Sequence, residues 1–274
     1  MPPPCKAIRA VAAPNPERQR TARDRLAQLF AHPASVFVIH YACQSLDQDQ
    51  RHGSPRVTAI AARNLENGDV TSFSIHAEAE LARLSPVQVL SRMDSLERAM
   101  LDKLFQFMQA NRAMRFVHWN MRDEVYGFPA IELGYAVLGG QPVGVPEASR
   151  IDLARLLMDI YGTRYVEPPQ FEAIARLNAL PTQGVLPGRE EADAFERGAY
   201  AAVKRSTLAK VRVMFDILHL AHDRTLRTNA NWWELNVGRV REACEMFERN
   251  PVQAVAGLAI AGASAGVGGI MKWL

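Results

Sequence analysis

Cysteine is scarce in this sequence, and its three cysteines are widely separated. Cys5, Cys43 and Cys244 are odd in number and show none of the close spacing of paired zinc ligands. The pattern argues against a disulfide framework and against a zinc module built on close-spaced cysteine pairs. It is typical of a protein in a reducing compartment.

A strong charge imbalance and an apolar N-terminal run are also lacking. The 32 basic and 29 acidic residues give a formal net charge of +3, which by itself is too small to imply nucleic-acid binding. Residues 1–20 return to charge before any apolar stretch reaches the length of a secretory signal. We therefore expect the bulk of the protein to be cytoplasmic.

The composition that is present, 48% hydrophobic and 22% charged, is that of a globular protein with a sizeable core. Residues 1–34 are predicted to form an N-terminal arm and a helix. Proline and alanine dominate the start of this segment, and apolar residues recur at helical spacing in residues 17–31.

Three strand-like runs follow. Residues 35–42, SVFVIHYA, have the β-branched and aromatic content of a buried central strand. Residues 56–64 and 70–75 flank Asn67 and Gly68, the dipeptide typical of a tight hairpin. The three runs predict sequential antiparallel strands.

The rest of the chain is predicted to be mostly helical. A helix over residues 91–109 leads into a short strand over residues 115–118. Further helical patterns cover residues 151–161, 170–177, 190–223 and 231–249. The order of elements predicts an α/β (α+β) protein with a mixed sheet.

The densest polar chemistry lies in residues 116–135, FVHWNMRDEVYGFPAIELGY. His118, Asn120 and Asp123 gather there between a predicted strand and a predicted helix. Polar residues that gather at a strand end are typical of a binding site.

This order of elements resembles the RNase H-like fold and, more narrowly, the DEDD-type 3′–5′ exonucleases. The resemblance spans about residues 35–220 and implies a mixed five-stranded sheet with flanking helices. RVTAIAARNLENGDVTSFSI resembles the second and third strands of those enzymes. In FVHWNMRDEVYGF, the resemblance gives His118 the place of the motif histidine and Asp123 that of a metal-binding aspartate. Asn120 is displaced by one residue from the usual asparagine.

The other metal ligands of the family are missing on this alignment. The first strand should end in an Asp-x-Glu pair, whereas it has His40, Tyr41 and Ala42. The late helix should carry a histidine and an aspartate four residues apart, and KRSTLAKV places Ser206 and Lys210 there. Because two-metal hydrolysis needs hard oxygen ligands, a degenerate exonuclease is favoured.

The alternative is an active 3′–5′ exonuclease dependent on Mg²⁺ or Mn²⁺. It would use Asp123 together with acids elsewhere, for example Glu97, Asp152 or Asp223. A second alignment of the late motif, on HLAHD, would pair His219 with Asp223 and restore one acid.

Two further groups carry alternatives. His40, Cys43, His118 and Asp123 could meet at the strand ends and hold a transition metal, or could simply fill space. Ser206 and Lys210 lie one helical turn apart, either as an activated nucleophile or as a surface that faces solvent or phosphate. The densest basic cluster is Lys204, Arg205, Lys210 and Arg212. Either it is a solvated helix face, or it contacts a phosphate backbone together with Arg122, so that the predicted nucleic-acid contacts are Arg122, Lys204, Arg205, Ser206 and Lys210.

The composition changes abruptly near residue 251. Residues 254–271 carry no charge, which approaches the roughly 20 apolar residues that span a bilayer core. Gly262 and Gly266 have the spacing that permits close helix approach in membranes, and Trp273 could anchor at an interface. The strongly apolar side chains include Val255, Leu258 and Ile260. The segment predicts membrane association, with a buried helix or an oligomer seam as the alternative.

Together these features predict an arm and helix (1–34), an RNase H-like domain (35–223), a helical connector (224–250) and an apolar helix (251–274). The predicted function is that of a degenerate exonuclease-like protein that binds nucleic acid or senses a partner protein, with a membrane-associating C-terminus. We expect the protein to form a homo-oligomer or to bind a partner protein, and to attach to the inner face of the membrane. By analogy of architecture alone, the combination favours a bacterial defence effector.

Overall fold

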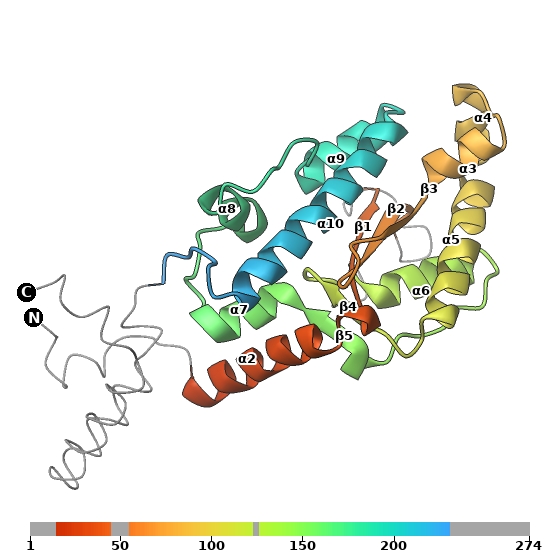
Figure 1. Ribbon diagram of the computed structural model, residues 1–274. Helices are drawn as coiled ribbons and strands as arrows, with labels where there is room; N and C mark the ends of the chain where they lie inside the picture. The colour runs from red at the N-terminus through yellow and green to blue at the C-terminus, as the bar shows by residue number, and fades with distance from the viewer. Residues whose placement is uncertain (1–14, 45–54, 123–125, 231–274) are drawn as a thin grey trace, which may run out of the picture.

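The computed structural model describes residues 15–44, 55–122 and 126–230 (Figure 1). Helix α2 (Pro16–Ala31) comes first, and the side chain of Asn15 caps it by accepting hydrogen bonds from the backbone N–H groups of Glu17 and Arg18. Its buried residues, Ala22, Leu26 and Leu29, recur at helical spacing, as the sequence predicts.

Five strands form one mixed sheet. They are β1 (Val36–Cys43), β2 (Val57–Asn64), β3 (Val70–Ser74), β4 (Arg115–His118) and β5 (Arg150–Asp152). The order across the sheet is β3-β2-β1-β4-β5, with β1 in the centre. Strand β2 is antiparallel to both of its neighbours, β1 and β3, whereas β4 pairs parallel with β1 and β5 pairs parallel with β4. The order and directions are compatible with an RNase H-like fold.

Helices connect and cover the strands. After β3 come α3 (Ile75–Leu81), α4 (Pro86–Ser91) and α5 (Met93–Ala110), and after β4 comes α6 (Phe128–Val137). Beyond β5 the chain forms α7 (Leu153–Tyr161), α8 (Gln170–Leu177), α9 (Gly188–Glu196) and α10 (Tyr200–His222). Two 3₁₀ turns, η1 (Pro33–Ser35) and η2 (Glu147–Ser149), precede β1 and β5. Figure 1 shows α10 along one face of the sheet and α5 and α6 on the other.

Each face of the sheet has its own core. Val38 of β1 and Val117 of β4 pack with residues of α2, α7 and α10. Ile39 of β1 and Phe116 of β4 pack with residues of α5 and α6. Successive side chains of a strand point to opposite faces of the sheet. The face of each polar residue at a strand end therefore follows from the core to which the preceding residues of the strand belong.

The sequence placed most of these elements correctly. The central strand, the hairpin around Gly68 and the helix that precedes β4 are confirmed. One predicted helix, residues 190–223, is wrong, because the chain breaks it into α9 and α10 around Gly198, which has φ +75°. Strand β5 is not predicted as a separate element, since its three residues run directly into α7.

The C-terminal predictions fall outside the described ranges. They comprise the helix over residues 231–249 and the apolar helix over 251–274, with Val255, Leu258, Ile260, Gly262, Gly266 and Trp273. Within the part of the chain that the structure describes, no helix combines the length and the apolar character needed to cross a bilayer.

Candidate functional site

The parallel strands β1, β4 and β5 end along one edge of the sheet, the edge at which α/β proteins bind ligands. Two regions of this edge differ. We call the first the closed corner, formed by His40, Cys43, Glu191 and Lys210. We call the second the open cleft, lined by α2, η2, α7 and the ends of β4 and β5.

A buried ion pair fills the closed corner. Lys210 Nζ of α10 lies 2.7 Å from Glu191 Oε2 of α9, and the two side chains are only 9% and 6% exposed. Such a pair loses the hydration of both charges, so its contribution to stability is small or negative, whereas removing one partner is costly. The corner therefore depends on both residues being present.

The β1 residues of the corner are uncharged at neutral pH. Burial lowers the pKa of His40 well below its usual value, and the Lys210 charge lowers it further. Burial raises the pKa of the Cys43 thiol to about 12, an effect that Glu191 strengthens and Lys210 opposes. A bulge between Ala42 and Cys43 breaks the alternation of β1 side chains between the two faces of the sheet. Both His40 and Cys43 lie close enough to Lys210 for its charge to affect their pKa values.

Ser206 lies one turn before Lys210 on α10 and is fully buried. Its Oγ accepts a hydrogen bond of 3.0 Å from the backbone N–H of Leu186, in the segment that precedes α9. The predictions that Ser206 and Lys210 form an activated nucleophile or contact phosphate are not tested by this arrangement and stay predictions. Both side chains are buried, and the lysine is bound to Glu191 rather than to the serine.

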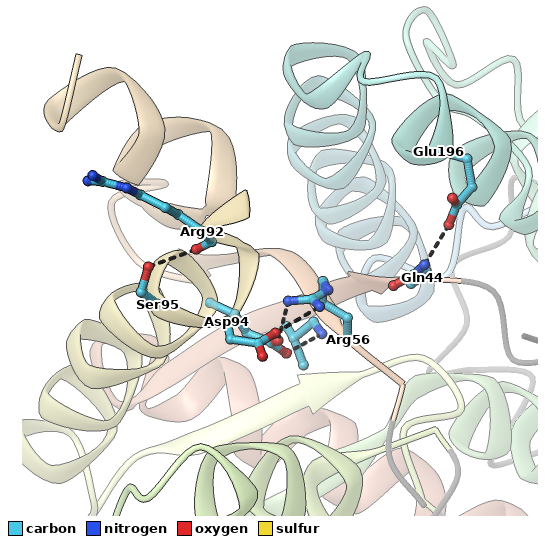
Figure 2. Close-up of polar contacts among 8 residues, drawn as sticks. Gln44, Arg56, Arg92, Asp94, Ser95 and Glu196 are labelled. Carbon is cyan, nitrogen blue, oxygen red and sulfur yellow. Dashed lines mark hydrogen bonds and ion pairs between the residues drawn. The ribbon is translucent and has the colours of Figure 1, made fainter. Parts of the chain in front are cut away.

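Helix α9 covers the corner by packing against β1 and α10 (Figure 1). At its C-terminal end, Glu196 Oε1 accepts a hydrogen bond of 2.6 Å from Gln44 Nε2, just beyond β1. Figure 2 shows this contact near the start of β2, where Arg56 pairs with Asp94. Phe195 packs edge-on against Tyr200 at the start of α10.

The open cleft is a cavity, whereas the side chains of Lys210 and Glu191 fill the closed corner. It has a volume of about 1080 Å³. His118 and Arg122 line it from the end of β4, and Asp152 lines it from the end of β5. Further charged lining residues come from α2, η2, β5 and α7, namely Glu17, Arg18, Arg25, Glu147, Arg150, Arg155 and Asp159.

His118 is 2% exposed and ends β4. Its Nδ1 accepts a hydrogen bond of 3.2 Å from the backbone N–H of Met121, so the neutral ring carries its proton on Nε2. Burial lowers the pKa of His118 to about 4, against the opposing effect of Asp152. Asn120 makes the tight turn between these residues with φ 55°, a conformation that asparagine tolerates.

Asp152 stands opposite His118 in the β4–β5 pairing. Its Oδ1 accepts hydrogen bonds from the backbone N–H groups of Ala154 and Arg155 and so caps α7. Its Oδ2 lies 2.7 Å from Arg122 Nε. Asp152 thus holds the start of α7 and the loop after β4 together, which accounts for its position without a bound metal.

Opposite charges nearly balance in the open cleft. Its lining contains five arginines and four acidic residues. Arg122 is paired with Asp152, and Arg150 lies 3.3 Å from Glu132, outside the lining. The cleft therefore lacks the excess of positive charge that a nucleic-acid backbone would require.

The structure separates the histidines that the sequence grouped together. His40 faces the Lys210 side of the sheet, whereas His118 packs edge-on against Phe128 of α6, so a metal site that contains both is corrected. Asp123 lies outside the described residues, and its metal and catalytic roles stay predictions. In residues 15–44, 55–122 and 126–230, no group of three or more His, Cys, Asp or Glu side chains could hold a metal ion.

The alternative acids occupy other places. Glu97 is buried under the start of β2, where it accepts a hydrogen bond from the Val57 N–H and pairs with Arg56. Asp223 follows the far end of α10, and its carboxylate pairs with His222. His219 packs against Phe30, near the end of α2 and before the start of β1. The HLAHD group therefore lies away from the edge of the sheet at which the parallel strands end. Asp152 lines the open cleft at the sheet edge.

Three of the basic residues that the sequence grouped together lie on the outer part of α10. Arg205 and Arg212 are exposed, and Lys204 is half-buried. Arg205 and Arg212 are seven residues apart and therefore share a helix face. Arg122, on the loop after β4, is exposed but paired with Asp152.

Sequence reasoning missed Glu191. It belongs to the helix GREEADAFE, in which two adjacent glutamates begin a short amphipathic element. Nothing in that pattern distinguishes Glu191, which is buried, from Glu190, which is exposed. The partner of Lys210 emerges only when α9 is placed against α10.

Comparison of the chain with protein-family models, with curated proteins and with solved structures gave no match in any of the three. The resemblance to exonucleases therefore rests on the strand order and on the residues at the sheet edge.

Proposed function

We propose that this chain is a nucleic-acid-binding protein, built on an RNase H-like sheet, that has lost two-metal hydrolysis. The observation that carries the proposal is the buried Lys210–Glu191 ion pair in the closed corner. In the exonucleases that the chain resembles, the first strand and the late helix supply acidic metal ligands at this corner. Here those elements supply His40 and Lys210.

The chemistry of this exchange favours binding over cutting. Two divalent cations need several carboxylate oxygens that converge on one point. The ammonium group of Lys210 repels cations, and the one carboxylate that reaches it, from Glu191, is neutralised by it. A site of this kind suits an anionic group better than a metal ion.

The exposed basic residues of α10 supply the electrostatic part of the proposal. Arg205 and Arg212 lie on one face of the helix whose buried face carries Lys210. Contacts between arginine and phosphate give affinity that falls with salt and depends little on sequence. The nucleic acid would therefore follow α10 rather than the charge-balanced cleft.

The binding test uses fluorescence anisotropy of short labelled single-stranded DNA and RNA at several salt concentrations. We expect binding that weakens as salt rises. Replacing Arg205 and Arg212 with alanine should reduce the salt slope by about 1 for each phosphate that is no longer neutralised. Arg18→Ala with Arg155→Ala, in the open cleft, is the matched control and should leave the slope unchanged. Loss of binding in the control alone would move the site to the cleft.

The activity test incubates the same oligonucleotides with the protein in Mg²⁺ or Mn²⁺. We expect intact substrate. Metal-dependent degradation by the wild type that disappears in Asp123→Ala would overturn the non-hydrolysing proposal and establish the active exonuclease as the function.

The proposed membrane association rests on the sequence of residues 251–274 alone. Flotation with liposomes compares the full chain with a chain that ends at Asn250. We expect only the full chain to float, and equal flotation of the two would remove the apolar segment from the proposal. A role in bacterial defence is proposed only from the combination of the two parts.

A further inference from the structure

The Lys210–Glu191 pair leaves one carboxylate oxygen unsatisfied. Glu191 Oε2 contacts Lys210 Nζ, but its other oxygen, Oε1, is buried and has no hydrogen-bond partner within the described residues. A buried acceptor without a partner costs free energy comparable to a lost hydrogen bond. The carboxylate of Glu191 is therefore an imperfect occupant of this corner.

His40 is the second unsatisfied group. It is 9% exposed, and neither Nδ1 nor Nε2 has a hydrogen-bond partner in the ranges that the structure describes. Buried polar groups in proteins are nearly always hydrogen-bonded to protein, water or a ligand. An ammonium beside an imidazole forms a donor pair that fits an anion with several acceptor oxygens. A phosphate group offers more such oxygens than a carboxylate does.

The helix that brings Glu191 into the corner is bounded by glycines. Gly184 and Gly198 have φ angles of +85° and +75°, and Gly188 begins α9. A Cβ at any of the three would meet nothing within 4 Å, so neighbouring atoms do not pack against these positions. Glycines at both ends permit the backbone rotations by which a short helix moves away as a unit.

We propose that Lys210 and His40 form a phosphate-binding site, and that Glu191 of α9 occupies it in this structure in place of the ligand. Movement of α9 about its flanking glycines would remove the carboxylate and admit a phosphate group. The identification of that group as one from a nucleic acid rests on the function proposed above. The site itself, for a phosphate of any source, follows from the geometry of the corner.

The pair Glu191→Gln and Glu190→Gln tests the site. Both substitutions remove one negative charge from α9, but Glu190 is exposed and Glu191 contacts Lys210. If the wild type is open for about a tenth of the time, removing the competing carboxylate tightens apparent binding by up to about tenfold. We expect Glu191→Gln to gain most of this factor and Glu190→Gln to behave like the wild type. Adding Lys210→Met to Glu191→Gln should abolish the gain.

Two measurements separate this inference from the proposed function. Anisotropy with labelled single-stranded DNA reports on nucleic-acid binding, and the shift of the melting temperature in inorganic phosphate reports on the site alone. Binding of DNA by the wild type, with Glu191→Gln no tighter and no phosphate shift, would overturn the inference and leave the proposed function intact. A phosphate shift in Glu191→Gln that is lost with Lys210→Met, without DNA binding by any variant, would support the site and overturn the proposed function.

Glu191→Ser provides a second route if the glutamine variant fails to fold cooperatively by circular dichroism. It removes the carboxylate and leaves a small hydroxyl in its place. Absence of a phosphate shift in a folded Glu191→Ser protein would also overturn the site.

Discussion

The closed corner and the open cleft lie on the same edge of one sheet, yet they use charge in opposite ways. In the corner a single ion pair is buried between two helices, and both its member Glu191 and its neighbour His40 retain unsatisfied polar atoms. In the cleft, opposite charges line an open space, and Asp152 caps α7 through Oδ1 and forms an ion pair with Arg122 through Oδ2. The filled corner carries the stronger evidence for a ligand.

The comparison also shows why cavity size is a poor guide to function here. Asp152 and His118 together resemble a catalytic pair, but the hydrogen bonds of each have structural explanations in the turn at Asn120 and the cap of α7. Lys210 has no such explanation. A hydrophobic pair would fill the same space without the loss of hydration.

The largest expected effect comes from breaking the ion pair. Lys210→Ala leaves the Glu191 carboxylate buried and unpaired, which should lower the free energy of unfolding by about 3–5 kcal/mol in urea titrations. The double replacement Lys210→Met with Glu191→Leu should restore stability to near that of the wild type. A much smaller loss in Lys210→Ala would indicate that α9 moves away in this variant and releases Glu191 to water.

A second, somewhat smaller effect is a loss of stability in acid. The pKa of His118 is about 4 in the folded protein and 6.5 in the unfolded chain, so the unfolded state binds more protons between these values. The contribution of the neutral His118 ring to the free energy of unfolding is fully present above about pH 6.5. It is lost as the pH falls toward 4, which lowers the free energy of unfolding by about 3 kcal/mol. His40, whose pKa is also lowered, acts in the same direction.

Urea titrations at several pH values check this loss in acid. His118→Asn and His40→Leu should each weaken the dependence of the free energy of unfolding on pH in acid. The change in the first variant measures the contribution of the cleft, and the change in the second measures that of the corner. An unchanged slope in both variants would show that other groups control acid unfolding.

The smallest effect is expected in the cleft. Asp152→Ala removes the cap of α7 and the partner of Arg122, and should cost about 1 kcal/mol, because the cap contributes most of the loss. Asp152→Asn keeps a capping side chain and should be nearly neutral. If Asp152→Asn is as costly as Asp152→Ala, the charge pair with Arg122 rather than the cap supports this region.

Local patterns were enough to predict much of the fold. The period of residues 35–42, the Asn67-Gly68 turn and the apolar face of the helix before β4 act over short distances, and each appears in the structure as expected. The failures also have local causes. Strand β5 is too short to show a period, and Gly198 interrupts what otherwise continues as one helical pattern.

The sequence by itself determined that the first strand carries His40 and that the late helix carries Lys210, because the identity of a residue needs no coordinates. It also singled out His40, His118 and Lys210. Only the tertiary structure decided that the two histidines face different sides of the sheet and that Lys210 is buried against Glu191. Glu191 and Lys210 are brought together by packing between helices, and the energy of a charge depends on its partner and its burial. Neither the partner of a charge nor its burial can be read from the local spacing of residues.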